Sequence, residues 1–187
     1  RDVVADNVML PRLFLAFLSP VFGTDAWYAA SVCAAILGMR KGSRLYKALV
    51  RDRQVAAEAT TFTYDLTTGS DLFVVDVTGL PQVSGEQLEH EVAREIDLLH
   101  ANGVTEDEVA RAVTLIQTDY IAALQSAGER ADRLSMFATY FGDPELINSQ
   151  VDRYRAVTAK AVNEFAGERL GEDNRASLLY VPRPVRR

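Results

Sequence analysis

The sequence predicts an α+β fold, a two-layer sandwich in which helices pack on one face of a mostly antiparallel sheet. Three observations favour this class. Strand-like apolar stretches lie near both ends of the chain and in a central hairpin, helical periodicity fills the regions between them, and the elements occur in groups. The expected order is strand, helix, helix, strand, strand, helix, helix, helix, strand.

The first two elements are a buried strand and a helix. Residues 8–19 (VMLPRLFLAFLS) are dense in apolar side chains and are followed by proline and glycine, which predicts a strand that ends in a turn. Thr24 is placed to cap a helix over residues 25–37. We interpret Trp27 and Tyr28 in this helix as packing residues rather than as a stacking platform for a ligand.

A glycine break then leads to a basic helix and a hairpin. Gly38 is expected to close the preceding helix, and Ser43 to cap the basic amphipathic helix that follows. Strands over residues 55–64 and 72–80 flank the turn-rich DLTTGSD and predict an antiparallel hairpin. Alternation in its second strand predicts one fully buried face and one partly covered face.

Two capping boxes mark the next helices. Ser84 pairs with Gln87, and Thr105 with Glu108, in the spacing that satisfies the first-turn amides of a helix. Apolar residues recur at helical spacing after both boxes, and the second helix is expected to run for about five turns until Gly128 interrupts it.

The last third of the chain is expected to hold two further helices and a strand. Pro144 should occupy the first position of a short helix, and Thr158 should cap a final helix through Leu170. Residues 176–181 are typical of a closing strand, and the tail VPRPVRR should leave the sheet because proline cannot donate to a ladder.

Composition sets the broad class. The chain has 187 residues, 48% hydrophobic and 25% charged, as expected for one soluble globular domain. A net charge of −6 argues against a nucleic-acid surface. Cys33 is the only cysteine, and its apolar neighbours predict a buried, inert thiol. The longest strongly apolar run, residues 13–18, is too short to span a bilayer, and the start at Arg1 suggests an excerpt or a processed product.

No catalytic, cofactor-binding or metal-binding residue can be assigned from the pattern. GxSxG, Walker and dinucleotide glycine patterns are absent from the sequence. His90 and His100 are ten residues apart, so we expect both on the polar side of an ordinary helix rather than around zinc. The acidic run at residues 106–108 starts a helix, where the helix dipole favours negative charge.

Four segments of the chain carry a resemblance. They are GMRKGSRLYKALVRDRQVAAEAT at 38–60, PRLFLAF at 11–17, ADRLSMFATYFGDPE at 131–145 and VDRYRAVTAKAV at 151–162. Together they resemble the pitrilysin and insulinase type (M16) zinc metallopeptidases and their mitochondrial processing relatives. The residues of the first segment that match the family pattern GxxSRLxxxLRExRGLAYS are Ser43, Arg44, Leu45, Leu49, Arg53 and Ala56.

The resemblance implies the same fold and a non-catalytic role. The family's zinc site is an HxxEH helix with a distant glutamate, and this sequence has no HxxEH, so the chain resembles the inactive, C-terminal-type domain. Val50 and Ala57 stand where many family domains carry an arginine and a tyrosine thought to hold the substrate backbone. Neither side chain can donate a hydrogen bond, and Arg51, one helical step away, is not given the role.

The resemblance therefore predicts a half-domain, residues 1–187, from a longer multi-domain chain. It would form part of a peptide-enclosing chamber and pair, in cis or in trans, with an HxxEH-bearing domain that holds the zinc. Its partners would be that domain and a peptide substrate, in the bacterial cytoplasm or periplasm. Two alternatives stay open: a catalytically dead scaffold domain, and an autonomous module that binds a peptide or protein.

Overall fold

The protein is described here as a computed structural model, which covers residues 1–65 and 69–183. Its strands form one sheet in the order β1-β5-β2-β4-β3, and all neighbours are antiparallel except β1 and β5. The strands are β1 Asp2–Asp6, β2 Arg12–Ser19, β3 Ala56–Thr63, β4 Asp71–Gly79 and β5 Arg175–Pro182. The predicted mostly antiparallel sheet is confirmed.

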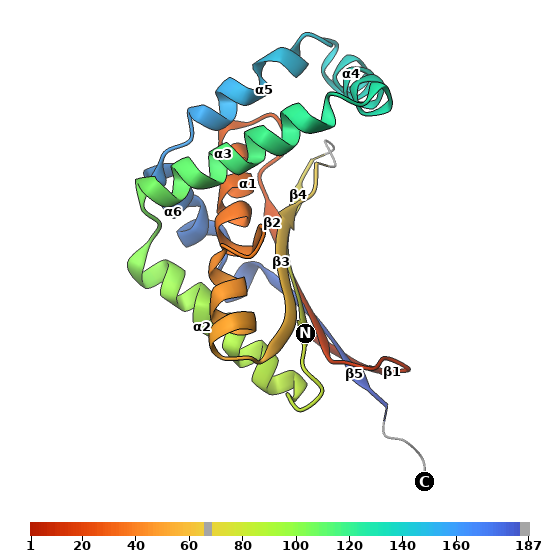
Figure 1. The fold of residues 1–187 in the computed structure, drawn as a ribbon, viewed down its shortest axis with the longest axis vertical. Helices are drawn as coiled ribbons and strands as arrows, with labels where there is room; N and C mark the ends of the chain where they lie inside the picture. Colours follow the sequence, from red (N-terminus) through yellow and green to blue (C-terminus); the bar gives the residue numbers. More distant parts are fainter. Residues whose placement is uncertain (66–68, 184–187) are drawn as a thin grey trace.

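The helices gather on one side of this sheet (Figure 1). They are α1 Asp25–Gly38, η1 Tyr46–Asp52, α2 Gly85–Asn102, α3 Glu106–Ala123, α4 Ala127–Phe141, α5 Leu146–Arg155, α6 Ala159–Arg169 and the short turn η2 Glu172–Asn174. The opposite face of the sheet carries no helix among the described residues (Figure 1). The two-layer α+β class expected from the sequence is therefore confirmed.

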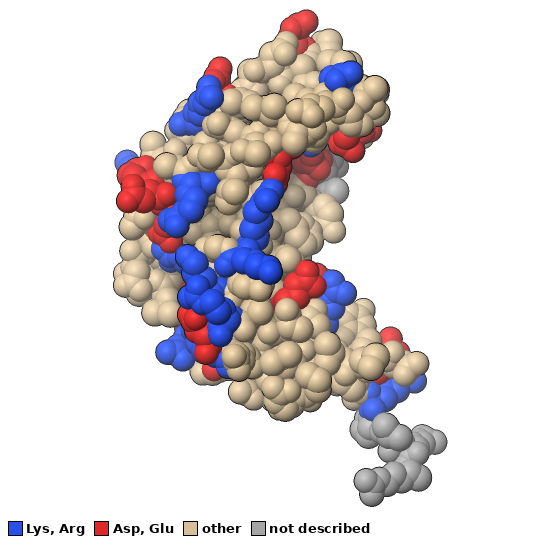
Figure 2. Space-filling model, viewed as in Figure 1, with Lys and Arg blue, Asp and Glu red and all other residues tan. Residues whose placement is uncertain are grey.

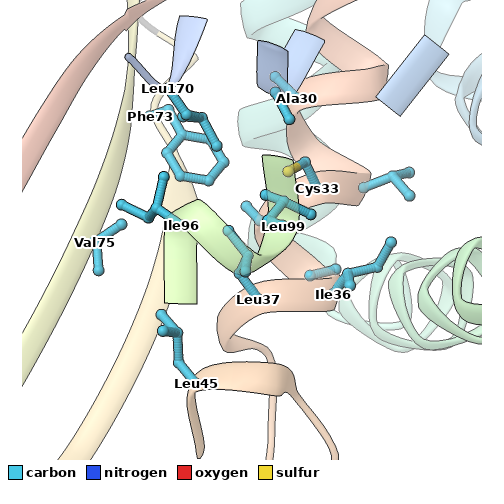
Figure 3. Close-up of a cluster of buried hydrophobic side chains, with 14 of the residues drawn as sticks. Ala30, Cys33, Ile36, Leu37, Leu45, Phe73, Val75, Ile96, Leu99 and Leu170 are labelled. Atoms are coloured by element: carbon cyan, nitrogen blue, oxygen red, sulfur yellow. The ribbon is translucent and has the colours of Figure 1, made fainter. Parts of the chain in front are cut away.

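The core lies between α1 and the sheet. In β4 the side chains of Phe73, Val75 and Val77 are fully buried, as the predicted alternation requires. Helix α1 is apolar on all sides because it also contacts α3, α5 and α6, so it has no solvent face to make polar. Figure 3 shows side chains of α1, including Cys33 and Leu37, meeting those of β4 and α2.

Helix starts follow the predicted caps. The side chain of each cap accepts a hydrogen bond from a first-turn amide, and the Thr105 box is closed by Glu108. The confirmed caps are Thr24, Ser84, Thr105 and Thr158. Among the described residues no helix combines the length and apolar composition needed to cross a bilayer.

The N-terminal part differs from the prediction in two ways. The strand expected over residues 8–19 begins only at Arg12, and residues 2–6 form the unexpected strand β1. Strand β1 pairs in parallel with β5, for example Asp2 with Leu178. Local sequence could not reveal it, because DVVAD is short, mostly exposed and paired with a strand at the other end of the chain.

The basic helix after Ser43 is largely a π-helix. Arg53 N–H donates to Ala48 O at 3.0 Å, a spacing of five residues, and η1 takes this form over Tyr46–Asp52. Ser43 lies directly before the first helical residue, and its carbonyl accepts from Lys47 N–H at 3.1 Å. Its hydroxyl instead donates to Arg40 O at 2.9 Å, so the predicted side-chain cap is not formed. Apolar periodicity predicts neither feature, because the end of η1 is fixed by ion pairs with a distant segment of the chain.

Gly38 ends α1 as predicted, but the reason is packing. A Cβ atom at this position would lie 2.2 Å from the backbone nitrogen of Thr61 in β3. The missing side chain thus lets the end of α1 approach the strand backbone. Close approach between distant segments, and not helix capping, explains this glycine.

Three further predictions, for the α3–α4 break, the start of α5 and the end of the last strand, differ from the structure. The break between α3 and α4 is set by Ser126, which caps α4, so Gly128 lies inside that helix. Helix α5 begins at Leu146, two residues after Pro144. Pro182 stays in β5, whereas residues 66–68 of the expected hairpin turn and residues 184–187 of the tail lie outside the described residues.

Candidate functional site

Arg44, a residue that matches the family pattern, is held by α3. Its Nε donates to Glu108 Oε1 at 2.8 Å, and an Nη donates to Glu108 Oε2 at 2.8 Å and to Gly103 O at 2.7 Å. Hydrogen bonds from Arg44, helped by the Thr105 amide, lower the pKa of Glu108 to about 2. The acidic run lies in the first turn of α3, as predicted, and the ion pair of Glu108 with Arg44 is an additional contact that the sequence did not reveal.

Arg53 is held in the same way by α2. It donates to Glu91 Oε2 at 2.5 Å and also to Glu95, a carboxylate only 8% exposed. These bonds tie the end of η1 to α2. Acidic and basic side chains consequently lie next to each other across this face of the molecule (Figure 2), and Arg53 is engaged within the fold.

The two departures from the family pattern remain departures in three dimensions. Val50 is partly buried against the hydrophobic core, and Ala57 is exposed at a bulge in β3 between Ala56 and Glu58. Arg51 pairs with its neighbour Asp52 at 2.7 Å. Val50 and Ala57 thus place no side-chain donor where the family pattern has one.

The histidines and the cysteine lie where the sequence predicted. His90 and His100 are exposed on α2, and His100 Nε2 is 3.1 Å from Ala166 O. Cys33 has no exposed surface, and burial raises the pKa of its thiol to about 12. In the part of the chain that the structure describes, no three His, Cys, Asp or Glu residues come together to hold a metal ion.

A pocket of about 480 Å³ lies between the edge strand β3 and helices α1, α3, α4 and α5. Its α1 wall includes Ser31, Ala34 and Ala35, which have the i, i+3, i+4 spacing of an HxxEH motif. A hydroxyl and two methyl groups do not make a zinc site, whose ligands are imidazole, thiolate and carboxylate. The residues present therefore do not fit zinc.

Polar groups on the α1 and α5 side of this β3 pocket bond to one another. Tyr28 Oη donates to Gln150 Oε1 at 2.7 Å, and the hydroxyl oxygens of Ser31 and Tyr154 are 3.3 Å apart. Burial raises the pKa of Tyr154 to about 12, so this hydroxyl is neutral at pH 7. Trp27 packs edge-on against Tyr28 with ring centroids 5.4 Å apart, which confirms the packing interpretation.

Arg133 of α4 also lines the β3 pocket, and sequence reasoning missed it. Its guanidinium carbon lies 4.9 Å from the centre of the Tyr120 ring. Its Nε is shielded from solvent and has no hydrogen-bond partner among the described residues. Asp119 lines the same pocket and could pair with Arg133, but it forms an ion pair with Arg40 instead. No local signal could have marked Arg133, because its neighbours come from four other elements.

The open face of the sheet carries a second, shallow depression of about 700 Å³. Met9 at its rim is 93% exposed, and Leu18 on the same face of β2 is 52% exposed. Phe14 and Arg12 lie between them, with Arg12 bonded to Asp76 at 2.6 Å. Exposed apolar side chains gathered on one face of a sheet are typical of an interaction surface.

Comparison with solved structures finds similar folds over nearly the whole chain. A protease from Helicobacter pylori matches with a TM-score of 0.86 and 20% identity, over 97% of this chain and 43% of that one. The inactive peptidase domain of a Bordetella parapertussis protein matches with a TM-score of 0.84 and 23% identity, over 98% and 97%. A chain of complex III2 from Candida albicans matches with a TM-score of 0.80 and 14% identity, over 96% and 45%.

These identities establish a shared fold, and the chain spans less than half of the Helicobacter pylori protease chain. A comparison with curated protein sequences found no relative. A family model described as the peptidase M16 inactive domain matches residues 2–116, more than half of the sequence. The chain therefore belongs to the M16 peptidase family, as an inactive domain of that family.

Proposed function

We propose that residues 1–187 form the non-catalytic half-domain of an M16 zinc peptidase assembly. In this assembly the chain pairs with an HxxEH-bearing domain, which holds the zinc, and forms part of the wall around the peptide. The apolar open face of the sheet is the observation that carries this proposal. A location in the bacterial cytoplasm or periplasm stays a prediction.

The open face of the sheet supports pairing because it exposes apolar side chains where a surface that stays in contact with solvent would be polar. Met9 and Leu18 are exposed, whereas the other side of the same sheet is sealed by helices. The ion pair between the half-exposed Arg12 and the mostly buried Asp76 adds a polar group to this surface. A partner domain that covers the face would remove apolar area from water at roughly 25 cal/mol per Å².

The free edge of β3 supports contact with an extended peptide. Tyr64 N–H donates to Leu72 O at 2.8 Å, so the preceding residue, Thr63, directs its N–H and C=O away from β4. Edge strands with unpaired groups can accept a further strand. A peptide added there would lie beside the β3 pocket, which Thr63 lines.

A peptidase assay with matched surface variants tests the pairing. The chain is mixed with the HxxEH-bearing domain of its parent chain, or with the protein encoded beside it, and a quenched unstructured peptide. Cleavage should need both components and should stop with a chelator. Leu18→Arg should lower cleavage at least about tenfold, because a charge would be buried unpaired in the interface.

The matched control is Ile121→Arg on α3, since Ile121 and Leu18 are both 52% exposed but lie on different layers. This variant should cleave like the unmodified pair. Equal loss in both variants would show that Leu18 acts through stability and not through docking. Zinc-dependent cleavage by this chain alone would overturn the non-catalytic assignment.

A second candidate is a catalytically dead scaffold domain. It is favoured by Val50 and Ala57, which provide no substrate-binding donors, and by the engagement of Arg44 and Arg53 in ion pairs within the fold. The fold shared with a chain of complex III2 is compatible with such a role. Tight association with the HxxEH-bearing partner, without any cleavage, would support the scaffold.

A further inference from the structure

We propose that the β3 pocket binds the carboxylate of a peptide and that Arg133 is its anion-binding residue. The inference rests on the proposed function, because the peptide is the one expected along the edge of β3. It adds a ligand chemistry to a pocket whose residues come from β3, α1, α3, α4 and α5.

The Arg133 guanidinium has no polar partner in the part of the fold that the structure describes. It has five N–H donors, yet it makes no hydrogen bond or ion pair with any described residue, and its Nε is shielded from water. A buried donor without a partner is costly, so an acceptor supplied by a ligand would be favoured. The ring of Tyr120 lies under the group, and Tyr120 Oη is itself fixed by donating to Ile147 O at 2.9 Å.

The charges around the β3 pocket leave Arg133 free for an anionic ligand. Two acids line the pocket, but Asp119 is paired with Arg40. Asp65, two residues beyond the end of β3, is exposed and makes no hydrogen bond or ion pair with Arg133. Arg133 is thus the unpaired cation among the described residues of the lining. One guanidinium can bind one carboxylate through a bidentate pair of hydrogen bonds, whereas a phosphate dianion needs more than one positive charge for neutralisation.

The β3 pocket lies beside the edge of β3 to which a peptide strand would add. Thr63 offers its N–H and C=O at the free edge and also lines the pocket. Phe62 and Ile116 also line the pocket and supply apolar contacts for a side chain of the peptide. A peptide on β3 can therefore reach Arg133 with either a C-terminal carboxylate or an acidic side chain, and these two sources share the same chemistry.

Three peptides distinguish the sources. All are eight residues of one neutral, apolar sequence with an uncharged fluorophore on the N-terminus. The first has a free C-terminus, the second has a C-terminal amide and one internal Glu, and the third has the amide with Gln in place of Glu. Fluorescence anisotropy with the 187-residue chain measures each affinity. At least one carboxylate peptide should bind about tenfold more tightly than the neutral peptide.

Arg133→Gln should remove this preference, and Arg133→Lys should keep part of it, because lysine retains the charge but loses the planar fork. The matched control is Arg94→Gln, which removes an exposed cation from α2 and should leave the preference unchanged. As a direct readout, the Arg133 Nε–H resonance, identified by its loss in Arg133→Gln, should shift with the carboxylate peptide and not with the neutral one. Circular dichroism confirms that each variant is folded.

The outcomes separate this inference from the proposed function. Equal binding of all three peptides, unchanged in Arg133→Gln, would overturn the carboxylate site and leave peptide binding at β3 intact. Equal loss of preference in Arg133→Gln and Arg94→Gln would also overturn it, because the effect would then be one of net charge. Binding of no peptide would overturn the carboxylate site together with peptide contact at β3, whereas the pairing with the HxxEH-bearing domain is tested separately by the cleavage assay.

Discussion

The two faces of the sheet are built from the same strands, but helices cover one face and leave the other exposed. In β2, Leu13, Leu15 and Phe17 face the helices and are fully buried, whereas Leu18 on the other face is 52% exposed. The first set is already covered in this chain, and the second is not. Alternate residues of one strand therefore separate the surface that stabilises the domain from the surface left for a partner.

Neighbouring alanine substitutions in β2 should give the largest difference between the faces. Phe17→Ala should cost about 3–5 kcal/mol of unfolding free energy, because it removes a fully buried ring and leaves a cavity. Leu18→Ala should cost less than about 1 kcal/mol, since that side chain is half in water already. Urea denaturation of the isolated chain measures both. Equal costs would mean that the open face belongs to the core of the chain.

Two glycine substitutions test how closely the helix layer packs on the sheet. Gly38→Ala should cost about 3 kcal/mol, because the new Cβ would meet the Thr61 backbone at 2.2 Å and α1 must move away from β3. Gly42→Ala meets nothing within 4 Å and should change stability by less than about 1 kcal/mol. The same urea titration serves. A neutral Gly38→Ala would show that α1 is loosely packed on the sheet.

Sequence reasoning worked where structure is set locally. The alternation of Phe73, Val75 and Val77 predicted their shared burial, and Thr105 with Glu108 predicted the start of α3. Caps and alternation depend on residues a few positions apart, so one sequence contains the whole signal. The helix layer and the antiparallel sheet follow from these elements.

The remaining features depend on contacts between distant segments. Strand β1 exists only through β5, and the reason for Gly38 lies in β3. Arg133 is an ordinary basic residue on an amphipathic helix until its missing partner is seen. Likewise, Arg44 and Arg53 match a family pattern in sequence. Only the structure shows that both form ion pairs within the fold, Arg44 with Glu108 and Arg53 with the acids of α2.

The smallest predicted effect compares an ion pair within the helix layer with one on the open face. The pKa of Glu108 is lowered to about 2 from 4.5, so its contribution to stability is present above about pH 4.5 and is lost as the pH falls toward 2. Glu108→Gln should therefore cost about 2 kcal/mol at pH 7 and almost nothing near pH 2. Urea titrations of both proteins at several pH values measure this convergence.

Arg12→Ala, on the open face, provides the contrast. Arg12 is half exposed but its partner Asp76 is only 14% exposed, so the loss of Arg12 should cost the isolated chain about 1 kcal/mol at pH 7, less than Glu108→Gln. A gap between Glu108→Gln and the unmodified protein that persists at pH 2 would contradict the ion-pair explanation for Glu108. A cost for Arg12→Ala as large as that for Glu108→Gln would show that the open face already stabilises the chain before any partner covers it.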